Sequence, residues 1–204
     1  MEYTETIFSH PSFERNRDPI LEQLKTVLPP DGQILEIASG TGQHAVYFQS
    51  ELPNIAWQPS DPDPDCRESI KTWTKYKNSK LPPPLNLNAT DEKWSLPQST
   101  IFNAIVCINM VHITPWECTL GLLSNASNVL QKRGILYLYG PFTQSHNYTS
   151  ESNKIFDRDL KNRNPTWGLK DIDEIQTAAE KKNLYLDDCV NMPANNFSLI
   201  FIRK

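Results

Sequence analysis

The chain has 204 residues, of which 38% are hydrophobic and 10% aromatic, enough apolar material for one globular domain with a single core. Its formal net charge is −4, and its basic residues are scattered among carboxylates, so we expect no nucleic-acid partner. No apolar stretch approaches the roughly 20 residues of a membrane span, and the first residues lack a signal-peptide pattern. We therefore expect a cytoplasmic protein without a membrane partner. A nuclear location stays open, and the sequence indicates no protein partner.

The four cysteines give no sign of a metal or redox site. Cys66, Cys107, Cys118 and Cys189 lie far apart, and no two of them form a C-x-x-C pair. Such spacing is typical of buried free thiols rather than of a zinc knuckle. We expect no metal and no disulfide.

Short apolar runs alternate with amphipathic stretches along the chain, a pattern typical of a parallel sheet covered by helices. The first helical face begins at Ile20, and we expect strands at 34–38, 55–58, 85–87, 102–109, 135–139, 184–190 and 197–202. Only residues 191–196 separate the last two strands, so they must form an antiparallel hairpin, because a parallel crossover needs about a dozen residues or more. The predicted fold is α/β: one Rossmann-like domain over residues 1–204, with a mostly parallel seven-stranded sheet and a C-terminal antiparallel hairpin.

Residues 141–170 form a connection much longer than usual. We interpret this segment as a lid over a pocket, with an ordinary helical insertion as the alternative. Tyr148, Asn153 and Trp167 combine aromatic surface with hydrogen-bonding groups, which suits the binding of a small-molecule substrate. Asn195, in the hairpin turn, is a further candidate for substrate binding, although asparagine also favours turns.

A glycine turn follows the first strand and leads into a helix that begins near Gln43. Glycines let the backbone approach a ligand closely, and a helix N-terminus offers unpaired N–H groups. The sequence therefore predicts a nucleotide-like ligand at this turn, bound by Ser39, Gly40, Thr41 and Gly42.

Two different ligands, NAD and S-adenosylmethionine, are consistent with the pattern of the glycine turn. The spacing Gly40-x-Gly42-x-x-Ala45 also satisfies the dinucleotide fingerprint, with Asp61 at a suitable distance for the ribose hydroxyls of NAD. Glu36 stands four positions before the turn, where a carboxylate repels a diphosphate but attracts the ammonium and sulfonium of S-adenosylmethionine. The residues favour S-adenosylmethionine, with Asp61 on its ribose.

The order of the glycine turn, Asp61 and the run Asn109-Met110-Val111-His112 resembles that of class I methyltransferases. More narrowly, the chain resembles the methyltransferase-like 26 family over segments 14–17, 36–44, 58–64, 109–116, 139–142, 149–153 and 192–196. The resemblance implies the class I methyltransferase fold and S-adenosylmethionine as cofactor, and leaves the substrate open. Ala38 departs from the glycine that many class I enzymes have. Asn88 replaces an aspartate that commonly helps hold the adenine, and an asparagine still forms hydrogen bonds.

Four further residues are candidates for the site. Arg15 and Asn16 precede the predicted first helix, and a guanidinium there suits the cofactor's carboxylate, with a surface ion pair as the alternative. Asn109, at a strand end, is expected to line the methionine pocket. His112 is the candidate catalytic base, because imidazole titrates near neutrality, although a lone histidine is often structural.

These residues lead to one hypothesis and two alternatives. We expect an enzyme that transfers a methyl group from S-adenosylmethionine to a small molecule, with alignment of the reactants supplying much of the rate. The first alternative is a non-catalytic regulatory module that binds S-adenosylmethionine. The second is an NAD-dependent oxidoreductase, disfavoured by Glu36 and by the terminal hairpin.

Overall fold

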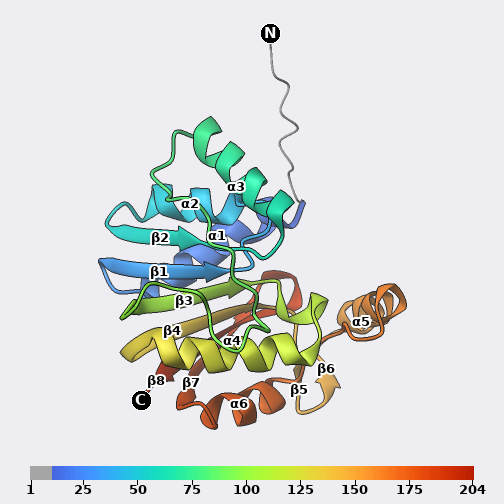
Figure 1. Cartoon of the computed structure of the whole chain (residues 1–204). Helices are drawn as coiled ribbons and strands as arrows, with labels where there is room; N and C mark the ends of the chain where they lie inside the picture. Colours follow the sequence, from blue (N-terminus) through green and yellow to red (C-terminus); the bar gives the residue numbers. More distant parts are fainter. Residues whose placement is uncertain (1–10) are drawn as a thin grey trace.

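The computed structural model describes residues 11–204, which form a six-stranded sheet of order β2-β1-β3-β4-β8-β7 (Figure 1). Strands β2, β1, β3 and β4 are parallel, and β8 runs antiparallel to both β4 and β7. A mostly parallel sheet with a C-terminal antiparallel hairpin is therefore confirmed. The strand bounds are β1 (Gly32–Ile37), β2 (Ile55–Pro59), β3 (Phe102–Ile108), β4 (Leu130–Gly140), β7 (Leu184–Met192) and β8 (Asn196–Arg203).

Helices cover both faces of this sheet (Figure 1). One face carries α1 (Pro11–Val27) and α2 (Gln43–Glu51), with α3 (Pro64–Tyr76) packed beside α2. The other face carries α4 (Trp116–Val129) and α6 (Ile172–Glu180). In the part of the chain described here, no helix is long and apolar enough to cross a bilayer.

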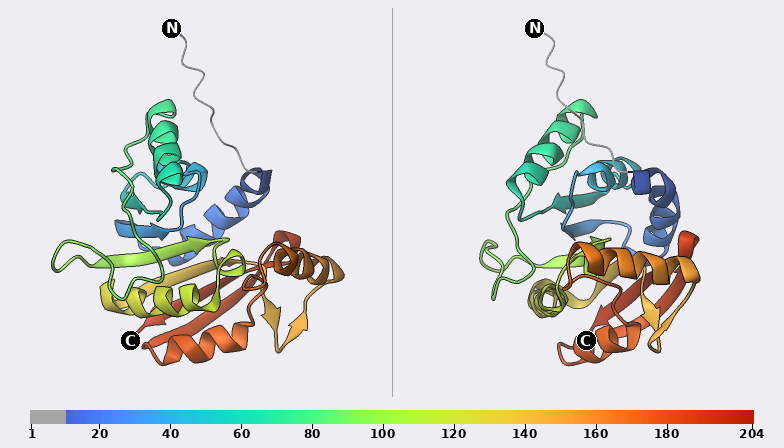
Figure 2. Two further views of the ribbon diagram at one scale, coloured as in Figure 1. Left: turned by 45° about the vertical axis from the view of Figure 1, so that its right-hand side comes forward. Right: turned by 90° about the vertical axis from the view of Figure 1, so that its right-hand side faces the viewer.

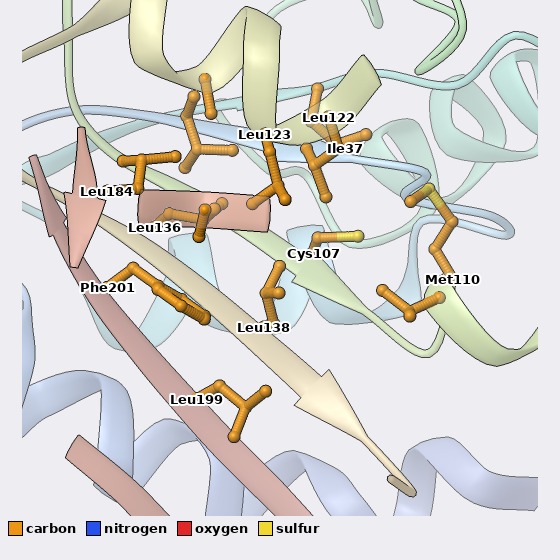
Figure 3. Close-up of a cluster of buried hydrophobic side chains, with 14 of the residues drawn as sticks. Ile37, Cys107, Met110, Leu122, Leu123, Leu136, Leu138, Leu184, Leu199 and Phe201 are labelled. Carbon is orange, nitrogen blue, oxygen red and sulfur yellow. The ribbon is translucent and has the colours of Figure 1, made fainter. Parts of the chain in front are cut away.

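Each face of the sheet has its own apolar cluster because side chains alternate along a strand. Ile34 and Val106 are buried under α1 and α2, whereas Leu35 and Cys107 are buried under α4 and α6. Figure 3 shows the second cluster, where side chains of β3, β4 and β8 meet those of α4. Strands buried on both faces explain the continuous apolar runs of the sequence.

The prediction of seven strands is wrong, because residues 85–87 contribute only an isolated bridge between Ser60 and Leu85. The N–H of Leu85 donates to the Pro59 carbonyl at 3.0 Å, and the Asp61 N–H donates to the Leu85 carbonyl at 3.0 Å. Prolines at 82–84 precede this bridge and have no N–H to donate to a ladder. The sheet consequently ends at β2.

The first helix begins two turns earlier than its apolar pattern predicts, so Arg15 and Asn16 lie within α1 rather than before it. Phe13 explains the extension. Its buried ring meets the rings of His44 and Tyr47 on α2, with centroid distances of 5.0 and 6.0 Å. Apolar periodicity could not predict this contact, because the residues between Phe13 and Ile20 are polar or proline.

The segment predicted as a lid contains a small hairpin, β5 (Thr143–Gln144) and β6 (Asn147–Tyr148), followed by α5 (Glu151–Arg163). Helix α5 lies beyond the carboxyl ends of the parallel strands, away from both helical layers (Figures 1 and 2). The sequence did not predict the hairpin, whose strands are too short to show alternation.

Asp157 ties this segment together. The carboxylate is 2% exposed, and it accepts hydrogen bonds from the Leu169 N–H at 2.7 Å, the Tyr148 hydroxyl at 2.7 Å and Lys161 Nζ at 2.6 Å. Burial alone would raise the pKa of Asp157, but these bonds together hold it below its ordinary value. One carboxylate therefore joins β6, α5 and the loop that follows α5.

We expect Asp157→Asn to loosen this segment by about 2 kcal/mol at pH 7, since it removes hydrogen bonds made to a charged group. The lowered pKa means that the ionised form stabilises the folded state above the ordinary carboxyl value of 3.8, and that this contribution is lost as pH falls through the folded pKa. Hydrogen exchange of the α5 amides measures the effect, with the exposed Asp159→Asn as control. Equal protection in both variants at pH 7 would show that Asp157 does not hold the segment.

Candidate functional site

A cavity of about 800 Å³ opens at the carboxyl ends of β1, β2 and β3. Its walls come from the turns after these strands, the first turns of α1 and one face of α5. In open α/β sheets this edge is where ligands bind. Of the residues that the sequence singled out, the cavity brings together Arg15, Asn16, Glu36, Ser39, Gly40, Thr41, Asp61, Asn88, Asn109, His112 and Asn153.

The two glycines of the turn after β1 have different tasks. Gly40 has a φ of +55°, and a Cβ built on it would meet nothing within 4 Å, because this position opens onto the cavity. Gly42 has a φ of +86°, and its Cβ would lie 2.8 Å from Cγ1 of Ile70 on α3. Gly42 therefore serves the packing of the turn against α3 and does not line the cavity. Ala38 also has a left-handed φ, 55°, which explains why glycine suits that position.

Asp61 closes the turn from the end of β2. Its Oδ2 accepts the N–H of Gly40 at 2.9 Å, and its Oδ1 accepts the N–H of Asp63 at 2.9 Å. The Gly42 N–H donates to the Ser39 carbonyl at 3.0 Å. Burial raises the pKa of Asp61, and the two N–H bonds oppose that rise. A carboxylate thus occupies the turn amide that a phosphate would otherwise use.

Glu36 is a second buried carboxylate in the same wall, with 2% of its surface exposed. Its Oε2 accepts hydrogen bonds from Ser39 Oγ at 3.0 Å and from Trp57 Nε1 at 3.1 Å. Within residues 11–204 its Oε1 has no hydrogen-bond donor. Burial raises the pKa of Glu36 to about 7, although the two hydrogen bonds partly counter it. Near neutral pH, this carboxyl is therefore ready to ionise beside a cation.

Two asparagines line the cavity beyond the acidic groups. The Oδ1 of Asn88 accepts hydrogen bonds from the N–H and the hydroxyl of Thr90, at 3.1 and 2.9 Å, so only its NH₂ group is left for a ligand. Asn109 follows β3 with a φ of 59°, a conformation that asparagine tolerates. Its N–H donates to the Tyr139 carbonyl at 2.8 Å, which holds the residue at the strand end.

His112 lies in the 3₁₀ turn η1 (Val111–Ile113) and is 6% exposed. Burial, together with the nearby positive charge of Lys170, lowers the pKa of His112 to about 4. The imidazole is therefore neutral at pH 7. Its ring centroid lies 5.6 Å from that of Phe156 on α5, so it stands where the lid segment meets the strand ends.

Three residues predicted to bind substrate lie outside the cavity wall: Tyr148, Trp167 and Asn195. The Tyr148 hydroxyl bonds to Asp157, and the Trp167 N–H donates to the Asn164 carbonyl at 2.9 Å. Asn195 lies in the hairpin turn, where its carbonyl accepts the amide of Asn153 at 2.9 Å. Asn153 itself does line the cavity.

Sequence reasoning missed several wall residues. Leu160 and Arg163 follow Asn153 at spacings of seven and ten, so the helical period could have found them. Cys66 and Cys118 also line the cavity, and neither they nor Cys189 are fully buried as expected, whereas Cys107 is. Nothing in the spacing of the cysteines indicated this.

A family model described as "Protein of unknown function (DUF938)" matches residues 8–203. The chain belongs to this family. The family description names no activity, so the residues of the cavity are the guide to the chemistry of this DUF938 member.

Several solved structures with the same fold are named as methyltransferases. An O-methyltransferase family protein from Burkholderia thailandensis is 13% identical with a TM-score of 0.76, and the match covers 95% of this chain and 57% of that one. Human N-acetylserotonin methyltransferase in complex with SAM is 11% identical with a TM-score of 0.75, covering 94% and 52%. A family 2 O-methyltransferase from Planctomyces limnophilus, in complex with apigenin, is 15% identical with a TM-score of 0.75, covering 95% and 60%.

The DUF938 chain thus spans little more than half the length of these proteins. At such low identity the likeness shows the fold alone, and it agrees with the class I methyltransferase architecture that the sequence predicted.

Replacing Gly42 by alanine should cost clearly more stability than replacing Gly40. Both substitutions carry the left-handed penalty of about 1–2 kcal/mol. Only Gly42→Ala also forces a methyl group into Ile70, which adds about 1–3 kcal/mol. Urea denaturation of the two variants measures the difference, and equal losses would contradict the distinction between a packing glycine and a cavity glycine.

Proposed function

We propose that this DUF938 protein is a methyltransferase that uses S-adenosylmethionine and methylates a small molecule. The observation that carries the proposal is the pair of buried carboxylates, Glu36 and Asp61, at the ends of adjacent strands around the open Gly40 turn. A cationic ligand with a ribose and without phosphate suits such a site.

The wall residues fit this cofactor part by part. Glu36 would face the ammonium and the sulfonium, and Asp61, while it holds Gly40, would offer its remaining lone pairs to the ribose hydroxyls. Arg15 and Asn16 on α1 would take the carboxylate; Asn16 is 6% exposed, and its amide has no hydrogen bond within the described residues. Asn88 would contact the adenine through its NH₂ group. Asn109 would line the methionine end, and Ser39 and Thr41 the turn itself.

The same geometry argues against NAD. A diphosphate needs free N–H groups at the glycine turn, and here Asp61 already accepts the N–H of Gly40. A diphosphate would also lie against the carboxylates of Glu36 and Asp61, and that contact is repulsive.

The bound cofactor would supply an electrophilic methyl group, which moves to the acceptor nucleophile as the bond to sulfur breaks. The chain's own contribution is alignment, worth up to about 7–11 kcal/mol in well-oriented systems. His112 is neutral at pH 7 and can accept a hydrogen bond from the acceptor's hydroxyl or amine. Its lowered pKa makes it a weak base, so its main role is to orient the acceptor, with the proton passing on to water.

Two finer proposals accompany this function. We propose that the resemblance to the methyltransferase-like 26 family reflects membership of that group, on the segments that carry it. We also propose a cytoplasmic location. The acceptor pocket would use Asn153 and Phe156 of α5 rather than Tyr148, Trp167 and Asn195, with the lid segment covering the reactants.

S-adenosylmethionine and its demethylated product should raise the melting temperature, while NAD should not. Saturation at about 100 times the Kd corresponds to roughly 2.7 kcal/mol of stabilisation. Asp61→Asn should weaken binding by about 10- to 100-fold because a charged acceptor is lost, whereas Asp65→Asn, on the exposed start of α3, should not. Stabilisation by NAD alone would refute the assignment.

His112→Gln should lower the rate of methyl transfer by up to about 10²-fold, because the acceptor would lose part of its alignment. Cofactor affinity should stay unchanged, because the proposed role concerns the acceptor alone. Transfer of labelled methyl into a metabolite extract measures the rate, and calorimetry measures the affinity. Tight cofactor binding with no transfer by the wild type would favour a non-catalytic binding module instead.

A further inference from the structure

One face of α5 forms the part of the cavity wall that the lid segment contributes. Its residues recur at helical spacing and change in character along the helix. They run from hydroxyl and amide through two apolar side chains to a guanidinium: Ser152, Asn153, Phe156, Leu160 and Arg163. At about 1.5 Å per residue, this face is roughly 15 Å long.

The polar start of this face is already engaged with the protein itself. The Asn153 amide donates to Thr149 Oγ1 at 3.0 Å and to the Asn195 carbonyl at 2.9 Å, which uses both of its N–H bonds. Besides the Oδ1 of Asn153, the positions left to recognise a ligand are therefore Phe156, Leu160 and Arg163.

These positions lie in a defined order relative to the reacting centre. Phe156 is next to His112, whose ring lies at the strand ends. Arg163 lies seven residues farther along α5, about 10 Å away along the helix axis. A molecule that places its nucleophile at His112 and its body along Phe156 and Leu160 would end at Arg163.

Among the described residues, the guanidinium of Arg163 has no counter-ion. It is exposed at the cavity and forms no ion pair among residues 11–204. Asp157, the buried acid of α5, is already paired with Lys161 at 2.6 Å. The carboxylates of the wall come from the end of β1, which carries Glu36, and from the turn after β2, which carries Asp61 and Asp63. The cavity wall is therefore acidic at the ends of β1 and β2, and α5 adds a positive charge through Arg163.

We propose that the acceptor is a small molecule with a flat apolar body and a carboxylate, and that Arg163 binds this carboxylate. The inference rests on the function proposed above. The planar guanidinium fork matches a carboxylate with two parallel hydrogen bonds. Phe156 and Leu160 supply an apolar wall for the body. Arg163 would thus determine specificity without touching the reacting atoms.

The test uses protein saturated with S-adenosylhomocysteine and a panel of hydroxylated aromatic carboxylates, each paired with its neutral carboxamide. We expect carboxylates to bind about tenfold or more tightly than their amides, as a charge-assisted pair implies. Arg163→Gln should remove that preference. Arg158→Gln, an exposed arginine of the same helix outside the cavity wall, should keep it. Ligand-observed NMR titration measures each affinity.

Equal affinity for acids and amides would overturn the inference, as would failure of every acid to bind or a preference that survives Arg163→Gln. Saturation with S-adenosylhomocysteine is checked beforehand by the shift in melting temperature. A protein that does not bind S-adenosylhomocysteine would refute the proposed function itself, so the two failures are distinguishable.

Discussion

The hydrogen bond from the Gly40 N–H to the Asp61 carboxylate determines what the cavity can hold. It joins the ends of β1 and β2 and places a negative charge where nucleotide-binding folds usually receive a phosphate. Glu36, buried beside the same turn, adds a second acid. Burial raises the pKa of both acids, so a cation in the cavity would favour their ionised forms.

The opposite side of the cavity is stabilised by two buried carboxylates whose pKa values are lowered rather than raised. Asp157 and Asp171 are buried, yet hydrogen-bond donors surround them, and the pKa of each is held below its ordinary value. Asp171 accepts bonds from the Thr143 hydroxyl at 2.8 Å and from the His146 N–H at 2.7 Å, so it holds both the first strand and the turn of the β5–β6 hairpin. Acids with several hydrogen-bond donors thus stabilise the segment that contains β5, β6 and α5, while acids with fewer donors line the cavity.

The strength of each sequence signal explains what could be predicted. Buried parallel strands and the short 191–196 connection gave the sheet and its terminal hairpin, because apolar runs and connection lengths are local properties. The glycine turn with Glu36 and Asp61 was found because its parts lie at fixed spacings. The missing strand at 85–87 depended on prolines that precede it, and the start of α1 depended on Phe13 meeting α2. The wall residues of α5 recur at helical spacing, but their position over the strand ends depends on tertiary contacts such as that between His112 and Phe156.

If Glu36 is the counter-ion of a cationic ligand, calorimetric titration with S-adenosylmethionine at pH 6 and at pH 8 will show it in the affinity. Because the pKa of Glu36 is about 7 in the free protein, affinity should be about tenfold lower at pH 6 than at pH 8, with proton release into the buffer near pH 7. Glu36→Gln should bind weakly and lack this component of the pH dependence. Equally tight binding at both pH values, by the wild type and by Glu36→Gln alike, would refute this role of Glu36.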